Sequence, residues 1–221
     1  MSGASGSSVL ERVAAVCQEG ITQARVDGAG VTMLAGSGTR LPVWSSDGIS
    51  AKVEDLQVTL GQGPCVEAIG SGLPVLVDDL GGSLVGPAQR WPMFHDEALR
   101  VGVRAIFAFP LVFGSVALGS LDLYRRTPGG LGDVELSRGV STAEALGETL
   151  VDQDSVSLAD EHLGSQMAVH RAAGIVTVQL DCGIDEALAR LRAAAYAEGV
   201  TVHRVAADVE AGRRRFSRDE P

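Results

Sequence analysis

The stretch from Met167 to Gly212 constrains the fold most strongly, because it contains no proline and repeats apolar residues at helical spacing in three successive blocks. Within each block the apolar residues recur three or four positions apart and so fall on one face of a helix. Gly183 and Thr201 stand where the second and third helices should begin, and Gly199 stands where the second should end. The spacing predicts three packed helices with the buried stripes Val169, Ala172, Val176 and Leu180, then Ile184, Ala187, Leu188, Leu191 and Ala195, and last Val202, Val205, Ala206 and Val209.

Short motifs at fixed places in these blocks carry a family resemblance. They are Arg171-Ala172-Ala173-Gly174-Ile175-Val176 in the first block, Glu186-Ala187 with Leu191-Arg192 and Ala194 in the second, and Val205-Ala206 in the third. In order and spacing they resemble the ANTAR domain of bacterial transcription antiterminators over residues 158–216. The resemblance implies an all-α three-helix bundle that binds paired RNA hairpins, usually as a dimer. The family often has lysine where this chain has Ala173, so one cation is missing from the expected RNA-binding face.

The candidate RNA contacts are the cations of this region and the small residues beside the first of them. Arginine offers phosphate a planar fork of donors and stacks on bases, and small residues would let an RNA backbone approach closely. The set is Arg171, Ala172, Ala173, Gly174, Arg190, Arg192, His203, Arg204, Arg213, Arg214 and Arg215. An alternative is that these arginines are ordinary solvated residues paired with Asp185, Glu186 and Asp208.

Two other classes of effector stay open at this point. The second and third helices could form a helix-turn-helix that reads DNA, in which case duplex DNA should be preferred to folded hairpins. The chain could instead be a small-molecule or redox sensor dimer with a degenerate effector, which would bind no nucleic acid.

The first part of the chain alternates helical and β-like segments, which predicts an α+β domain. A helix over Val9 to Ala24 precedes a hairpin of residues 30–34 and 40–44. The later segments are a helix over 50–60, a strand over 74–77, a helix that ends at Arg100, and a second hairpin of 104–112 and 116–124. The run from Leu56 to Ala68, together with the last strand pair, resembles a GAF domain, a sensory fold with a central antiparallel sheet flanked by helices.

Proline marks the boundary between the halves, since seven of the eight prolines lie at or before residue 128. We expect a disordered tail over 1–8, a GAF sensory domain over 9–132, a linker helix over 133–157, an ANTAR domain over 158–216 and a tail over 217–221. A coiled-coil-like stripe in the linker helix predicts a homodimer, because no other partner for it is obvious. This dimer seam consists of Leu136, Val140, Ala143, Leu146 and Leu150.

Cys65 is the candidate sensor residue, because it follows Pro64 at the start of a predicted helix that could lower the pKa of its thiol. A buried packing role is the alternative, and Val66 in place of a histidine argues against a covalent bilin. Whether a small-molecule ligand binds this half stays open. No cofactor or metal site is expected, since the three cysteines are widely spaced and the histidines do not cluster, and His95 is expected at the surface.

Charge and composition narrow the function further. A net charge of −10 excludes a generally cationic coat, so RNA must meet a local patch. Nucleotide-binding loops, serine-hydrolase motifs and zinc-protease motifs do not occur, so we expect no enzyme. Without a signal peptide or a run of about 18 apolar residues, we expect a cytoplasmic protein with no membrane segment. The sequence thus predicts a cytoplasmic, homodimeric, RNA-binding regulator of the antitermination type under the control of a GAF sensor.

Overall fold

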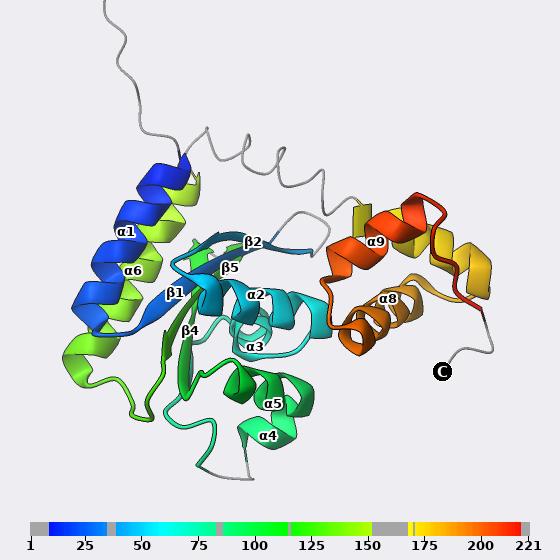
Figure 1. Cartoon of the computed structure of the whole chain (residues 1–221). Helices are drawn as coiled ribbons and strands as arrows, with labels where there is room; N and C mark the ends of the chain where they lie inside the picture. The colour runs from blue at the N-terminus through cyan, green and yellow to red at the C-terminus, as the bar shows by residue number, and fades with distance from the viewer. Residues whose placement is uncertain are drawn as a thin grey trace, which may run out of the picture.

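The computed structural model describes residues 9–34, 39–82, 86–114, 116–151, 168–169 and 171–217 (Figure 1). The expected tail over residues 1–8, the turn at 36–38 and the tract over 152–157 lie outside the described residues. Two units follow one another, an α+β unit up to residue 151 and a helical unit from residue 168 onward. The predicted α+β fold class is confirmed.

A five-stranded antiparallel sheet forms the centre of the first unit, in the order β2-β1-β5-β4-β3. Its strands are β1 (Gly28–Leu34), β2 (Arg40–Ser45), β3 (Val75–Val77), β4 (Ala105–Phe113) and β5 (Val116–Arg125). Both predicted hairpins are confirmed, since β1 pairs with β2 and β4 pairs with β5. The pairing of β1 with β5 joins them, and its register sets Gly30 opposite Asp122 and Thr32 opposite Ser120. Because side chains alternate along a strand, Thr32, Ser120 and Asp122 lie on one face of the sheet.

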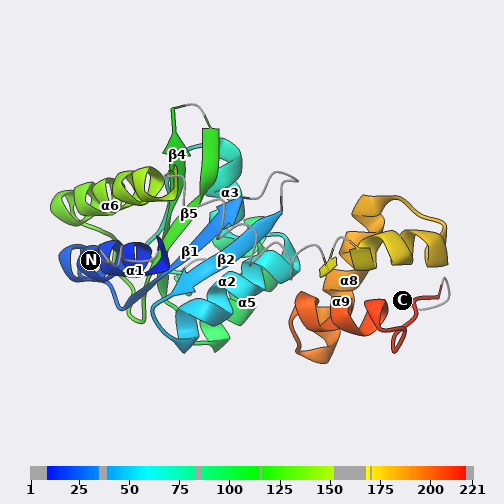
Figure 2. The same ribbon diagram turned by 90° about the horizontal axis from the view of Figure 1, so that it is seen from above.

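Helices cover both faces of this sheet, as Figures 1 and 2 show. One face carries α1 (Val9–Ala24) and α6 (Asp133–Val151), side by side, and the other carries α2 (Gly48–Leu60) and α3 (Pro64–Ser71), with α4 (Pro87–Arg90) and α5 (Pro92–Arg100) next to them. The alternation along β4 divides the core. Phe107 and Phe109 pack with α1 and α6, whereas Ile106 and Ala108 pack in the cluster that contains Phe94 of α5.

The apolar stripe of α6 is buried inside the chain, which corrects the reasoning behind the expected dimer seam. Ala143, Leu146 and Leu150 belong to the core under the sheet, Leu136 packs against it, and Val140 is 37% exposed. Close packing reinforces this contact: an added Cβ on Gly139 would lie 2.5 Å from the Phe109 ring. The stripe therefore has a partner that the sequence did not reveal, namely α1 and strand β4.

The second unit is the predicted helical bundle. Residues 171–180 are helical, and α8 (Ile184–Glu198) and α9 (Val202–Glu210) follow. The expected ends of these helices are confirmed. Gly183 is the N-cap of α8, and Gly199 ends α8 with a left-handed φ of 64°. The Thr201 side chain caps α9 by accepting a hydrogen bond from Arg204 N. All three predicted stripes form one core except at Ile184, the first residue of α8, which is 45% exposed.

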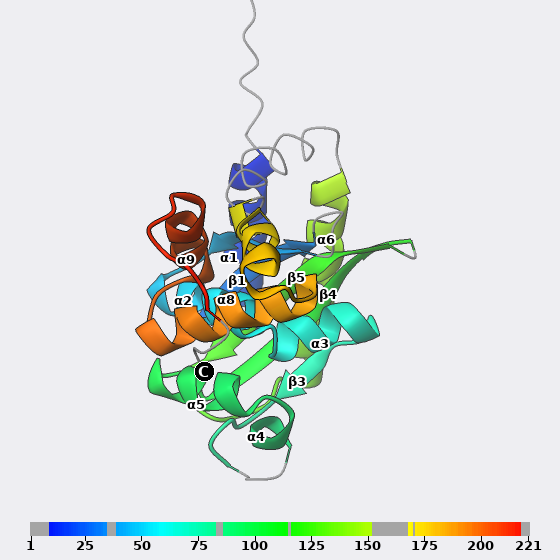
Figure 3. The same cartoon turned by 90° about the vertical axis from the view of Figure 1, so that its right-hand side faces the viewer.

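The two units touch along α2 and α8, and Figure 3, seen from the bundle side, shows α8 in front of the helices of the first unit. Val58 of α2 packs against the bundle core, and the Tyr196 hydroxyl of α8 donates to Glu97 Oε1 of α5 at 3.3 Å. A groove of about 710 Å³ lies along this contact. Within the described part of the chain, no helix is both long enough and apolar enough to cross a membrane.

Candidate functional site

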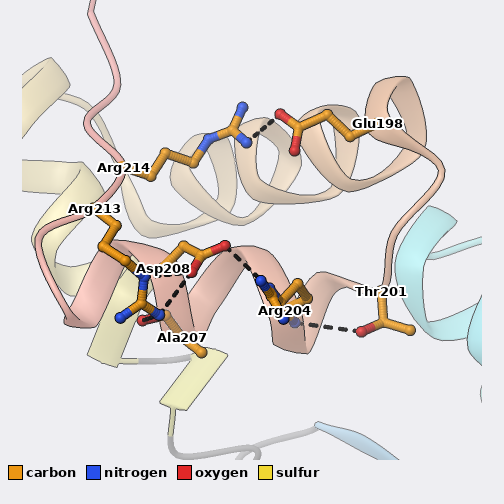
Figure 4. A network of polar contacts seen from close by, with 7 residues as sticks. All are labelled: Glu198, Thr201, Arg204, Ala207, Asp208, Arg213 and Arg214. Carbon is orange, nitrogen blue, oxygen red and sulfur yellow. Dashed lines mark hydrogen bonds and ion pairs between the residues drawn. The ribbon is translucent and has the colours of Figure 1, made fainter.

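The arginines around α9 form a mixed-charge surface, drawn in Figure 4. Asp208 pairs with Arg204 on one side at 3.3 Å and with Arg213 on the other at 2.7 Å. Arg214 pairs with Glu198 of α8, and the two arginines on Asp208 keep most of their side chains in solvent. The pKa of Asp208 is held below its ordinary value, chiefly by the hydrogen bond from Arg213. The cations are therefore available at the surface, but acids partly neutralise them.

Three more of the predicted RNA contacts are arginines of the same bundle. Arg171 pairs with Glu210, at the far end of α9, with 2.5 Å between Nε and Oε1. Arg215 is exposed, and no ion pair to it occurs among the described residues. Arg190 lies 3.9 Å from Glu186 within α8. The alternative of acid-paired arginines thus matches Glu186 and Asp208, while Glu198 and Glu210 are partners that the sequence did not suggest.

Arg192 and His203 face the first unit instead. A Cβ built on Gly61, the residue that ends α2, would lie 3.4 Å from Arg192 Cζ. His203 is half-buried near Asp55 of α2, and burial lowers the pKa of His203 while the Asp55 charge opposes that shift. These two side chains therefore lie at the contact between the units, apart from the cations around α9.

The small-residue part of the predicted RNA face is wrong for two positions. Ala172 and Ala173 are fully buried in the bundle core, whereas Gly174 is exposed. Ala172 lies on the buried stripe of its helix, so an RNA backbone cannot reach Ala172 unless the bundle opens. Ala173 is consequently a core residue in this chain.

The first unit contains a polar network inside its core, between the sheet and helices α2 and α3. Glu54 Oε2 accepts a hydrogen bond from Thr32 Oγ1 at 2.5 Å. Asp122 accepts from Ser120 Oγ at 2.6 Å and from Gln57 Nε2 at 2.5 Å. Gln57 Oε1 in turn accepts from the backbone N–H of Cys65 at 2.8 Å. Thr32, Glu54, Gln57, Cys65, Ser120 and Asp122 are all buried.

Burial dominates the electrostatics of this network. It raises the pKa of Glu54 well above its ordinary value, and the charge of Asp122 adds to the effect. It also raises the pKa of Asp122 to about 6. Burial and both carboxylates raise the pKa of Cys65, which is the opposite direction from a helix-activated thiol. Cys65 is buried, as the alternative of a packing role expects.

Sequence reasoning missed Glu54, Gln57 and Asp122, although one signal was available. Asp122 interrupts the apolar run Leu121-Asp122-Leu123 in the middle of a predicted strand, and a charge on the buried face of a strand is unusual. His95 was also misplaced: it is buried, and its Nε2 lies 2.6 Å from the carbonyl oxygen of Leu80. It therefore ties a helix to a loop and is not a surface residue.

The fold and these sites define a class of protein: a sensory α+β domain joined to a small helical effector. The family model of the GAF domain matches residues 8–158, and that of the ANTAR domain matches residues 159–209. The chain therefore belongs to the GAF domain family and is a GAF–ANTAR protein. Such proteins are RNA-binding antitermination regulators that take part in signal transduction.

Solved structures agree with the sensor fold. The GAF domain of a phosphoenolpyruvate-protein phosphotransferase from Coxiella burnetii matches with a TM-score of 0.52 at 14% identity, over 69% of this chain and 88% of that one. The photoproduct state of GAF3 from Slr1393 of Synechocystis sp. PCC6803 matches with a TM-score of 0.51 at 20% identity, over 70% of this chain and 98% of that one. No curated protein matches the chain.

Proposed function

We propose that this protein is a homodimeric, non-catalytic regulator whose ANTAR bundle binds RNA hairpins and whose GAF unit controls that binding. The observation that carries the proposal is the coincidence of the ANTAR match with a three-helix bundle that presents arginines on its surface. Arg171, Arg204, Arg213, Arg214 and Arg215 supply the cations in this acidic chain, and RNA binding needs such a local patch.

The acid partners of these arginines do not prevent RNA binding. Exposed ion pairs contribute only about 0–1 kcal/mol, and a phosphate oxygen can take the place of a carboxylate oxygen on the same guanidinium group. Arg204 and Arg213 share a single carboxylate, so a phosphate that displaced Asp208 would meet two forks at once. Because a phosphate must displace Asp208, RNAs that place phosphates close to both Arg204 and Arg213 would bind best.

Docking of the two units supports control by the sensor. Arg192, a predicted RNA contact, lies against the end of α2, and His203 lies near Asp55 of the same helix. RNA cannot reach these side chains fully while α2 covers them. A sensor state that releases α2 from the bundle would add them to the cations around α9 and strengthen hairpin binding.

The first experiment measures the affinity of the full chain for paired-hairpin RNA and for duplex DNA as a function of salt. We expect preference for hairpins, and Arg213→Ala should lower the slope of log affinity against log salt by roughly 0.7–0.9 for each phosphate that the arginine neutralises. Arg138→Ala, which removes an exposed cation from α6, is the matched control and should leave the slope unchanged. Preference for duplex DNA, or no binding at all, would overturn the proposal.

The second experiment tests control by docking. Val58→Asp places a charge where Val58 packs against the bundle, so it should separate the units and raise hairpin affinity. Leu73→Asp changes a residue of the sensor surface that is 66% exposed and should have no effect. Equal affinity in Val58→Asp and the wild type would show that docking does not regulate binding.

The homodimer needs a surface other than the buried stripe of α6. Val134, Val140 and Val151 remain exposed on that helix and offer apolar area to a second copy. Sedimentation equilibrium of the full chain should show a dimer. A monomer at micromolar concentration would contradict this part of the proposal.

A further inference from the structure

Three side chains with metal-binding atoms meet in the polar network of the sensor core. One carboxylate oxygen each of Glu54 and Asp122 and the Cys65 sulfur lie within 4.8 Å of one another, and all three residues are buried. They come from α2 and α3, which follow one another in the chain, and from β5, which is far from both in the sequence. No motif with the spacing of a metal site links them, so only the fold brings them together.

One buried oxygen of this cluster receives no hydrogen bond from an N–H or hydroxyl group of the described residues. Within the described part of the chain, no N–H or hydroxyl group donates to the buried Glu54 Oε1, while Oε2 is bonded to Thr32. A buried carboxylate oxygen without a donor is strongly unfavourable, and such atoms are rare in native cores. The Glu54 and Asp122 carboxyl groups are also close enough to share one proton in a hydrogen bond between them, and a cation could take the place of that proton.

The surroundings of the cluster resemble the support that metal ligands receive. Ser120 and Gln57 each donate a hydrogen bond to Asp122, and Gln57 also accepts from the backbone of Cys65. Hydrogen bonds of this kind fix the orientation of ligating side chains and tune their basicity. Gly30 leaves room for Glu54, because an added Cβ there would lie 2.4 Å from Oε1.

We propose that Glu54, Cys65 and Asp122 bind one divalent transition-metal ion of the zinc or ferrous class. A thiolate with two carboxylates suits a borderline ion better than Mg²⁺ or Ca²⁺, which prefer oxygen ligands alone. Bonds of about 2.3 Å to sulfur and 2.0–2.2 Å to oxygen require the three atoms to close in modestly from their present separation. The proton of the Cys65 thiol, and the proton held on the carboxyl pair, would leave to solvent as the ion binds.

Three protein ligands leave a fourth position of a tetrahedral ion open to water or a small ligand. The ion would also fix α2, since that helix carries Glu54 inside the sensor and Asp55 and Val58 at the contact with the bundle. If the ion is the signal that the sensor detects, that role rests on the proposed function. Binding of the ion does not.

Cobalt titration of the chelator-treated full chain tests the site, because a thiolate bound to Co²⁺ gives a charge-transfer absorption band in the near ultraviolet. We expect one Co²⁺ per chain, displaced by Zn²⁺, with the band lost in Cys65→Ala. Glu54→Gln and Asp122→Asn keep the side-chain shapes and should weaken binding at least about tenfold. Cys17→Ala is the matched control, since Cys17 is another buried cysteine and lies in the core between α1, α6 and the sheet.

Circular dichroism establishes that each variant is folded. A folded wild type that binds no Co²⁺, a band that persists in Cys65→Ala, or unchanged affinity in folded Glu54→Gln would each overturn the proposal. If Cys65→Ala does not fold, Glu54→Gln and Asp122→Asn decide. These results are independent of hairpin affinity, so failure of the metal site and failure of RNA binding are distinguished.

Discussion

The cores of the two units differ in polarity. The sensor buries Glu54, Gln57 and Asp122 beside its apolar residues, whereas the bundle core consists of alanine, valine and leucine with Phe216. Among the described residues of the bundle, no charged or polar side chain is fully buried. Buried polar groups lower stability unless their partners are complete, so a protein keeps them mainly where a site requires them.

The candidate site lies on the surface of the bundle but in the core of the sensor. In the bundle, stability comes from the inside and the cations lie outside, so the surface can change without unfolding the unit. In the sensor, the candidate site is part of the core, so changes to the site alter stability as well. Four predictions test this contrast, beginning with the largest expected effect.

Leu146→Asp should lower the free energy of unfolding of the sensor by roughly 4 kcal/mol or more, because it places a carboxylate in an apolar core. Chemical denaturation measures the effect. Ser141→Asp on the same helix, at an exposed position, should change stability by less than about 1 kcal/mol. A folded monomeric Leu146→Asp protein would show that the stripe joins two subunits and does not belong to the sensor core.

Leu191→Ala should destabilise the bundle by roughly 2–5 kcal/mol, because Leu191 is fully buried and alanine leaves a cavity. Hydrogen exchange should show the weaker protection in residues 171–217 and leave the sheet unchanged. Arg190→Ala, next to it in α8 and half-buried, serves as the control. An equal decrease of protection in both units would mean that they unfold together, and the contrast drawn between their cores would have no consequence for stability.

Removing one helix cap in each unit should lower stability by smaller amounts. Thr201→Ala removes the N-cap of α9 and should cost about 1 kcal/mol, while Thr201→Ser should not. Asp47→Ala should cost more, about 2 kcal/mol, because Asp47 caps α2 and also accepts a hydrogen bond from the Tyr124 hydroxyl at 2.9 Å. Thermal unfolding of the four proteins decides the order, and an equal cost would remove the role assigned to Tyr124.

The smallest expected effect is a pH dependence of docking. Burial at the contact lowers the pKa of His203, so the docked state holds fewer protons than the separated state. Docking should therefore be complete above the ordinary histidine pKa of about 6.5 and should weaken as the pH falls through the lower pKa of the docked form. Hydrogen exchange in α2 and α8 between pH 7.5 and 5.5 would detect this change.

His203→Gln is the control for that measurement, since it keeps a polar side chain but cannot take up a proton in this range. Burial raises the pKa of the nearby Asp55 carboxyl, and this shift acts in the opposite direction, at more acidic pH. A pH dependence that persists in His203→Gln would assign the effect to another group.

Much of the local structure followed from the sequence. Hairpins, helix spans and the caps at Gly199 and Thr201 depend on residues close together in the chain, where spacing and turn chemistry decide the conformation. The predicted RNA face was less successful. Ala172 was correctly placed on the buried stripe, yet it was also expected to meet RNA, and the structure shows that only the first of these two expectations holds.

What the sequence alone determined is the set of amphipathic segments and the two family resemblances, because periodicity and motifs are local properties of a chain. Only the tertiary structure decided which surfaces meet. The register of β1 against β5 placed Thr32 opposite Ser120 and Gly30 opposite Asp122. The packing of α1 gave the stripe of α6 a partner, and the contact of α2 with α8 covered Arg192. These are contacts between distant segments, which depend on how complementary surfaces fit together and not on any pattern within one of them.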